Sequence, residues 1–108
     1  MAQDNPRPPQ VIVSADAVID LALIYIQTVE TWDQEKAERY NEFLLGTFDK
    51  LAVMPFLGRP IAERPGLISY IAKWKRARHG HRIVYRQVDE RFEIVRVLHT
   101  AMNWQDHI

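Results

Sequence analysis

Basic side chains concentrate in one part of this 108-residue chain. Between Arg59 and Arg86 eight basic residues occur with a single acidic residue, Glu63, whereas the whole chain has no net charge. Such a cationic segment attracts phosphates or carboxylates, so the pattern favours an acidic partner. The same residues have a second interpretation, because lysines and arginines also keep solvated edge strands from pairing with other chains.

Two arginines and a histidine in consecutive predicted strands suggest a specific chemistry. Metal-independent RNA cleavage needs a base for the 2′-hydroxyl, an acid for the leaving oxygen and cations for the phosphorane. Arg82 and Arg96 would stabilise the charge, and His99 would transfer a proton. Nearby aromatic side chains would suit stacked bases; they are Tyr70, Trp74 and Tyr85.

A competing interpretation assigns these residues to the structure itself. Tyr85 and Trp74 would then belong to the core, and the arginines would be solvated or paired with Glu93 and Asp89. In a third interpretation, the basic surface binds an acidic protein segment.

Several functional classes are not supported by the composition. The chain has no cysteine, which excludes disulfides, thiolate zinc sites and cysteine nucleophiles. Its four histidines form no HExxH pattern, and no phosphate-binding glycine loop occurs, so we expect neither a metal nor a cofactor. No run reaches the roughly 18 apolar residues of a membrane span, and the N-terminus does not resemble a signal peptide. We therefore expect a cytoplasmic protein without a membrane partner.

The residues before the cationic segment predict two helices joined as an antiparallel hairpin. Ser14 is placed to cap a helix over residues 15–32, and Asp33 to cap a second over residues 34–53. The first helix should be buried on most sides, because only a strip through Asp20, Gln27 and Glu30 is polar. Its apolar residues form two stripes: Val18, Leu21, Tyr25, Val29 and Trp32, and Ile19, Leu23 and Ile26.

Four strands are expected around the hairpin. One is the short run 10–13, and three follow a proline- and glycine-rich loop at 54–66, at 67–75, 81–88 and 92–98. Short links make the last three an antiparallel meander. Strict alternation places Arg96 on the face of Phe92 and Ile94. Because the last run is apolar on both faces, the second face should meet either another polypeptide or the C-terminal tail that contains Trp104.

The predicted fold class is α+β, in the order β-α-α-β-β-β, with a helical hairpin packed on a small antiparallel sheet. We expect a flexible lead-in at residues 1–9 and a single domain over residues 10–108.

The order and spacing of these pieces resemble the RelE/ParE superfamily of toxins from type II toxin–antitoxin modules. Three clusters of residues carry the resemblance, which covers nearly the whole chain. The first comprises Asp20-Leu21 with Ile24, and Ala37 with Tyr40. The second comprises Leu51-Ala52-Val53-Met54-Pro55, Gly58-Arg59-Pro60 and Gly66-Leu67. The third and strongest is His81-Arg82-Ile83-Val84-Tyr85-Arg86 followed by Ile94-Val95-Arg96-Val97-Leu98-His99 and Met102.

The resemblance to the ParE branch, carried by Val97-Leu98-His99 and Met102, implies a toxin that inhibits DNA gyrase by binding, without catalytic residues, and a ParD-like antitoxin as partner. The alternatives are a RelE-like ribosome-dependent mRNA endonuclease, with Arg82, Arg96 and His99 as its catalytic residues, and a decayed, non-toxic binding module. The residues predicted to bind antitoxin or target are Arg59, Lys73, Lys75, Arg76, Arg82, Arg86, Arg96, His99 and Trp104.

Overall fold

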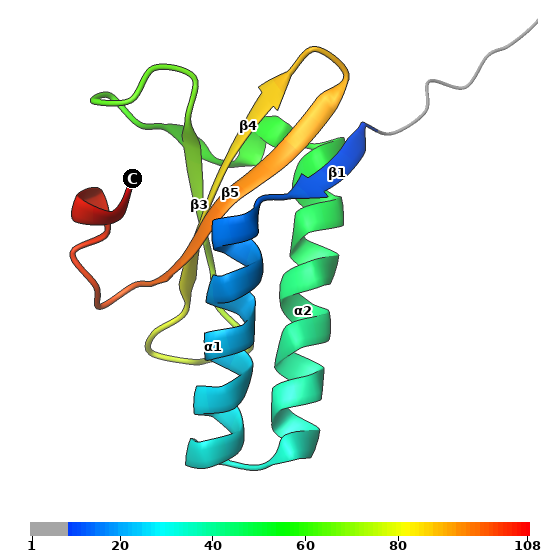
Figure 1. Ribbon diagram of the computed structural model, residues 1–108, viewed down its shortest axis with the longest axis vertical. Helices are drawn as coiled ribbons and strands as arrows, with labels where there is room; N and C mark the ends of the chain where they lie inside the picture. Colours follow the sequence, from blue (N-terminus) through cyan, green and yellow to red (C-terminus); the bar gives the residue numbers. More distant parts are fainter. Residues whose placement is uncertain (1–8) are drawn as a thin grey trace, which may run out of the picture.

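Two helices cover one face of a five-stranded sheet in the computed structural model, which describes residues 9–108 (Figure 1). The elements are β1 (Gln10–Val13), α1 (Ala15–Thr31), α2 (Gln34–Val53), β2 (Arg59–Pro60), β3 (Ile68–Ala72), β4 (His81–Val88) and β5 (Arg91–His99), with 3₁₀ helices at Pro55–Leu57 and Trp104–His107. The predicted α+β class and order of elements are confirmed. The loop predicted over residues 54–66 is wrong in part, because it contains a 3₁₀ helix and the additional strand β2. The lead-in predicted over residues 1–9 lies outside the described residues except for Pro9.

Both helices begin at the predicted caps. The Ser14 hydroxyl accepts a hydrogen bond of 3.1 Å from the Ala17 amide, and the Asp33 carboxylate accepts one of 2.7 Å from the Lys36 amide. Each cap satisfies an amide that would otherwise lack an intrahelical partner. Because only two residues separate the helices, they lie antiparallel (Figure 1).

The sheet has the strand order β1-β5-β4-β3-β2. The predicted antiparallel meander is confirmed for β3, β4 and β5, and the short β2 extends it at one edge. At the other edge β1 pairs with β5 in parallel, so the sheet is mixed rather than wholly antiparallel. No tight turn joins β1 to β5, and their relative direction is therefore not fixed by a hairpin.

A β-bulge changes which side chains of β5 face the helices. Val84 pairs with Arg96 and Tyr85 pairs with Ile94, so Val95 has no partner across the ladder. The strict alternation predicted for β5 is therefore wrong beyond Ile94. The helix-facing partners across β4 and β5 include Ile83 with Val97, whereas Arg82 pairs with Leu98 and Val84 with Arg96 on the outer face.

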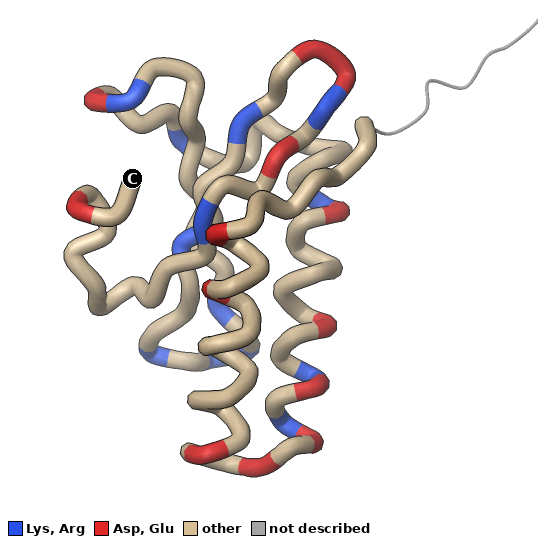
Figure 2. The backbone as a smooth tube through the Cα atoms, in the orientation of Figure 1, with Lys and Arg blue, Asp and Glu red and all other residues tan. Residues whose placement is uncertain are grey.

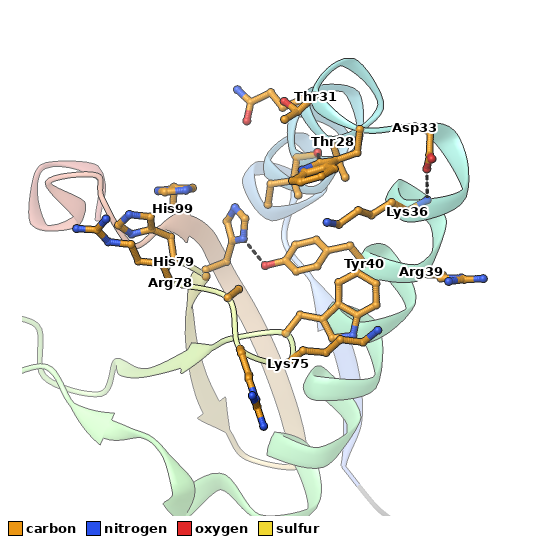
Figure 3. A pocket seen from close by; sticks show the side chains of 18 of the residues that line it. Thr28, Thr31, Asp33, Lys36, Arg39, Tyr40, Lys75, Arg78, His79 and His99 are labelled. Carbon is orange, nitrogen blue, oxygen red and sulfur yellow. Dashed lines mark hydrogen bonds between the residues drawn. The ribbon is translucent and has the colours of Figure 1, made fainter.

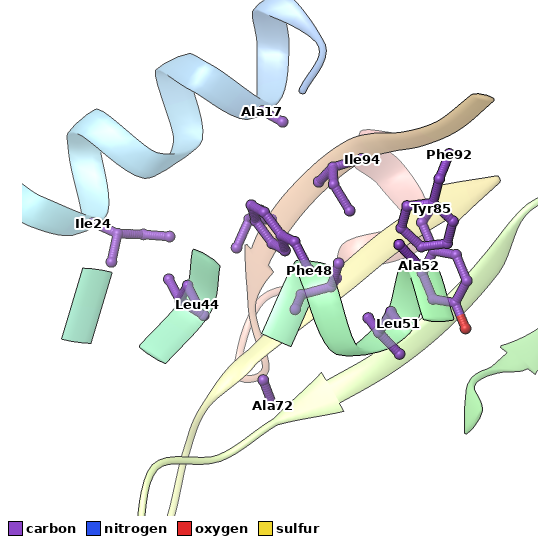
Figure 4. Packing of buried hydrophobic residues seen from close by; sticks show 12 residues of the cluster. Ala17, Ile24, Leu44, Phe48, Leu51, Ala52, Ala72, Tyr85, Phe92 and Ile94 are labelled. Atoms are coloured by element: carbon purple, nitrogen blue, oxygen red, sulfur yellow. The ribbon is translucent and has the colours of Figure 1, made fainter. Parts of the chain in front are cut away.

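The core lies between the hairpin and the sheet (Figure 4). Leu44, Phe48 and Leu51 of α2 pack towards Tyr85 and Phe92, whose ring centroids are 5.0 Å apart. Full burial of side chains of this size contributes about 1.5–3 kcal/mol each. The buried tyrosine hydroxyl remains satisfied: it donates to the carbonyl oxygen of Pro55 at 2.7 Å and accepts from the Gly58 amide at 3.1 Å.

Helix α1 presents a different face to solvent from the one predicted. Its buried residues are Ala17, Asp20 and Ile24, so the expectation that Asp20 is solvated is wrong. The expected burial of both apolar stripes is wrong as well, because all of the second stripe and two residues of the first, Val18 and Trp32, are exposed. Four aliphatic side chains, each between 51% and 57% exposed, form what we call the α1 stripe: Val18, Ile19, Leu23 and Ile26.

Candidate functional site

The basic residues singled out in the sequence are distributed over three parts of the structure. Figure 2 shows basic positions along the sheet and in the loop that follows β3, whereas the two helices together carry seven acidic and three basic residues. Arg82, Arg86 and Arg96 belong to the outer face of the sheet, opposite the helices. Lys73, Lys75 and Arg76 lie in the loop after β3, and Arg59 is exposed in the edge strand β2.

Arg96 is held in a nearly buried ion pair. Its Nε and Nη2 atoms donate to the two carboxylate oxygens of Asp20 at 2.8 and 2.9 Å, and the Val97 amide donates to the same carboxylate at 2.9 Å. These hydrogen bonds to Asp20 are the main reason that the pKa of Arg96 is raised. Because β1 pairs with β5 only as far as Ile94, the edge beyond it is free to receive Asp20 from α1. We call this pair the Asp20–Arg96 junction.

The C-terminal segment covers part of the outer face (Figure 1). The guanidinium of Arg82 lies 4.3 Å from the centroid of the Trp104 ring, and Arg82 Nη1 donates to Ser69 Oγ at 3.1 Å. Burial lowers the pKa of Arg82. Arg96 Nη1 also donates to the His107 carbonyl at 2.8 Å. The second face was predicted to contact either another polypeptide or the tail, and the tail covers at least part of it. Val84 and Leu98 on that face are fully buried.

The three residues proposed for RNA cleavage do not meet on one face. His99 pairs with His81, whose side chain contacts Tyr40 of α2. Arg82 and Arg96 lie on the opposite, outer face of the sheet, where they pair with Leu98 and Val84. Both arginines have their guanidinium groups engaged within the chain. Arg86 forms an exposed ion pair of 2.6 Å with Glu93, as the structural interpretation of these arginines predicts.

An open cavity of about 910 Å³ separates the tip of the helical hairpin from the loop between β3 and β4 (Figure 3). We call it the hairpin-tip cleft. The loop is tightly fixed at its end, because a Cβ on Gly80 would lie 2.1 Å from the Ala72 carbonyl oxygen. Lys75 in the same loop has a φ of 59°, a left-handed conformation that few residues other than glycine adopt. The backbone therefore holds the cationic loop opposite the hairpin.

Aromatic and histidine side chains form the inner wall of the cleft. The Tyr40 hydroxyl lies 2.6 Å from His81 Nδ1. Burial raises the pKa of Tyr40 to about 12, and burial, followed by the nearby His99, lowers that of His81 to about 4. Both side chains are thus neutral at pH 7. The ring of Tyr40 is 5.8 Å from that of Trp74, centroid to centroid.

Sequence reasoning did not select the hairpin residues of this cleft. Lys36 and Tyr40 lie four residues apart on one side of α2, and Trp32 caps the end of α1 just before it. That spacing was the available signal. Within residues 9–108 the structure contains no cluster of three or more histidine and acidic side chains placed to hold a metal ion. Over the same range, no helix has the length and apolarity that crossing a membrane requires.

Comparison with known proteins gives concordant matches along most of the chain. Residues 11–104 match the family model described as the ParE toxin of the type II toxin–antitoxin system parDE. Toxin ParE1 of Caulobacter vibrioides is 31% identical over 96 residues, which cover 89% of this chain and 94% of that protein. A chain from the structure of a chromosomal ParDE system of P. aeruginosa superimposes with a TM-score of 0.69 at 22% identity, covering 84% of this chain and 95% of its own, which supports the fold.

Proposed function

Since this chain belongs to the ParE toxin family of type II toxin–antitoxin systems, we propose that it acts by binding: it inhibits DNA gyrase in the cytoplasm and is neutralised by a ParD-like antitoxin. The gyrase target is supported by the resemblance of Val97-Leu98-His99 and Met102 to the ParE branch. The antitoxin is supported by the family and by the surface of α1.

The α1 stripe is the observation on which the proposed binding function rests. All four residues are about half exposed, and Ile19, Leu23 and Ile26 follow one another at intervals of four and three along one side of the helix, with Val18 beside them. A contiguous apolar surface of this kind commonly marks a protein interface. An amphipathic segment of a partner would bury it with apolar residues of its own at helical spacing. Each Å² removed from water contributes about 25 cal/mol before the costs of association.

The arrangement of the arginines favours binding over RNA cleavage. Arg96 is engaged by Asp20, Arg82 is covered by Trp104, and neither shares a face with His99. A cleavage site needs its cations and its proton-transferring group around one phosphate.

A charge placed in the α1 stripe tests the antitoxin interface. Leu23→Glu should weaken binding of the cognate antitoxin by about a hundredfold, because a carboxylate would have to be desolvated in the interface. Titration calorimetry against the purified antitoxin measures the change. Leu45→Glu is the matched control, because Leu45 is an exposed leucine of α2 outside the stripe. Equal affinity of the Leu23→Glu variant and the wild type would exclude the stripe as the interface.

The target is tested with purified gyrase. Supercoiling should be inhibited by the wild-type chain and restored by stoichiometric antitoxin, whereas unimpaired supercoiling at saturating protein would remove gyrase as the target. Codon-resolved cleavage of mRNA on translating ribosomes, lost in Arg82→Ala or His99→Ala, would instead support the RelE-like alternative. Normal growth after induction without antitoxin would indicate a non-toxic module.

A further inference from the structure

The hairpin-tip cleft combines two kinds of surface that a ligand would have to match. One wall, from the hairpin and the start of the loop, carries the rings of Trp32, Tyr40 and Trp74. Three cations of the loop also line the cleft, Lys75, Arg76 and Arg78, and the Lys75 ammonium lies 4.9 Å from the centroid of the Trp74 ring. The two acidic residues at the rim are already engaged, because Asp33 caps α2 and Glu35 pairs with Arg39 at 2.6 Å.

Lys36 brings a positive charge inside the cleft rather than at its rim. Figure 3 shows its side chain extending from α2 into the space above Tyr40, whereas Arg39 points away. The Lys36 ammonium lies 3.5 Å from the centroid of the Trp32 ring. Within residues 9–108 no carboxylate lies within ion-pair distance of it. Lys36 is a partly buried residue whose ammonium lies over an aromatic face and forms no ion pair with the described residues, so its charge is available to an anion.

The aromatic wall is the second requirement on the ligand. Trp32 is 64% exposed, so packing within the chain does not account for a tryptophan at this position. Trp74 stacks on Phe43 at 6.3 Å and keeps its ring at the wall of the cleft. Exposed rings beside cations are the arrangement on which nucleic-acid bases stack while their phosphates are neutralised.

We propose that the hairpin-tip cleft binds a nucleoside phosphate, with the base against the tryptophan rings and the phosphate between Lys36 and the cationic loop. A volume of about 910 Å³ lies within the range typical of small-molecule sites. An acidic peptide would neutralise the loop but would leave the aromatic wall without a planar partner. A free nucleotide and the end of a single-stranded nucleic acid present the same chemistry, and the experiment separates them.

Calorimetric titration of the purified full-length chain tests this site. The probes are AMP, ATP, hexathymidylate, hexauridylate, inorganic phosphate and hexaglutamate. Binding of AMP or ATP more tightly than the oligonucleotides identifies a free nucleotide as ligand, and the reverse order identifies a single strand; both support the proposal. No binding of any nucleotide, phosphate bound as tightly as AMP, or hexaglutamate bound more tightly than every nucleotide would overturn it.

Variants assign the binding to the cleft. Lys36→Ala and Trp32→Ala should each lower the affinity for the nucleotide by about tenfold. This is the effect of losing a hydrogen bond to a charged group or a stacking contact with a base. Lys50→Ala is the matched control: Lys50 lies on the same helix over another ring, that of Tyr70 at 5.2 Å, outside the cleft. Affinity unchanged in Lys36→Ala would overturn the assignment. The site is separate from the α1 stripe, so antitoxin binding should survive Lys36→Ala, and failure of either proposal leaves the other intact.

Discussion

The Asp20–Arg96 junction and the hairpin-tip cleft both include residues of α1, but the junction pairs its charges, whereas Lys36 in the cleft has no ion-pair partner within residues 9–108. At the junction, one carboxylate accepts three hydrogen bonds from Arg96 and the Val97 amide. In the cleft, Lys36 faces an aromatic ring, and the loop cations lie in solvent.

The difference indicates which charges serve the fold and which are available to a ligand. A buried charge whose partners all come from the same chain is explained by the structure alone, because leaving it unpaired would cost several kcal/mol. The cations and the exposed tryptophan of the cleft have no such explanation within the described part of the chain. Of the arginines chosen from the sequence, Arg96 belongs to the first kind, whereas Arg82 has a buried Nε without a hydrogen-bond partner in the described residues. Lys36 belongs to the second kind.

Removal of the junction carboxylate should have the largest effect. Asp20→Ala leaves the Arg96 guanidinium and the Val97 amide without their partner and should lower the free energy of unfolding by about 3–5 kcal/mol. Urea denaturation followed by circular dichroism measures the loss. Asp16→Ala, one turn earlier and exposed, is the control and should cost less than about 1 kcal/mol. Similar losses in the two variants would mean that the junction is not a structural pair.

Acidification from pH 7 to pH 5 should lower the free energy of unfolding through His81, by less than the Asp20→Ala substitution does. The pKa of His81 is lowered to about 4, below the ordinary value of 6.5. As the pH falls from 7 to 5, the unfolded chain takes up a proton at this side chain that the folded chain does not. The free energy of unfolding should therefore fall, by about 1–2 kcal/mol after allowance for partial exposure.

The contribution of His81 is isolated by comparing unfolding curves at pH 7 and pH 5. The difference in the free energy of unfolding between pH 7 and pH 5 should be smaller in His81→Gln than in the wild type, by about 1–2 kcal/mol. His107→Gln, which alters an exposed histidine, should retain the wild-type difference. An equal pH dependence in His81→Gln and wild type would show that His81 is not held neutral in the folded chain.

Trp32 should be the least important of these residues for stability. Because its side chain is largely exposed, Trp32→Ala should change the free energy of unfolding by no more than about 0.5 kcal/mol. The same urea denaturation measures it. A loss comparable to that of Asp20→Ala would make this tryptophan a packing residue, and the contrast between the two regions would then disappear.

Local signals were sufficient to predict the two helices and the meander, but not the short strand β2, the 3₁₀ helices or the faces that the elements bury. Ser14 and Asp33 act through contacts within a few residues, and the caps they form were predictable for that reason. Which face of α1 is buried depends on where the sheet and the second helix pack around it. No local sequence pattern gives those positions. As a result Asp20 is buried against β5, while Ile19, Leu23 and Ile26 remain exposed.

The candidate site was predicted less well than the fold. Lys75, Arg76 and His99 were predicted to bind antitoxin or target, and they line the hairpin-tip cleft, but the sequence did not predict that they meet there. Lys36 was not singled out, and Tyr40 was placed only on the second helix and among the residues of the family resemblance. Their distance from the loop in the sequence gives no indication that they meet it. Tyr40 contacts His81 across 41 positions of the chain.

The unpaired Val95 has a consequence for every residue that follows it. The bulge shifts the in–out alternation of β5 by one position, so Val97 enters the core. Arg96 lies on the outer face and donates hydrogen bonds to the Asp20 carboxylate and to the His107 carbonyl in the tail. Deletion of this one valine would therefore restore an uninterrupted ladder while leaving Arg96 on the outer face and Val97 in the core. The faces that Arg96 to His99 present thus depend on how the strand accommodates one residue, Val95, whose carbonyl is bound by the Ser14 hydroxyl at 2.8 Å instead of by β4.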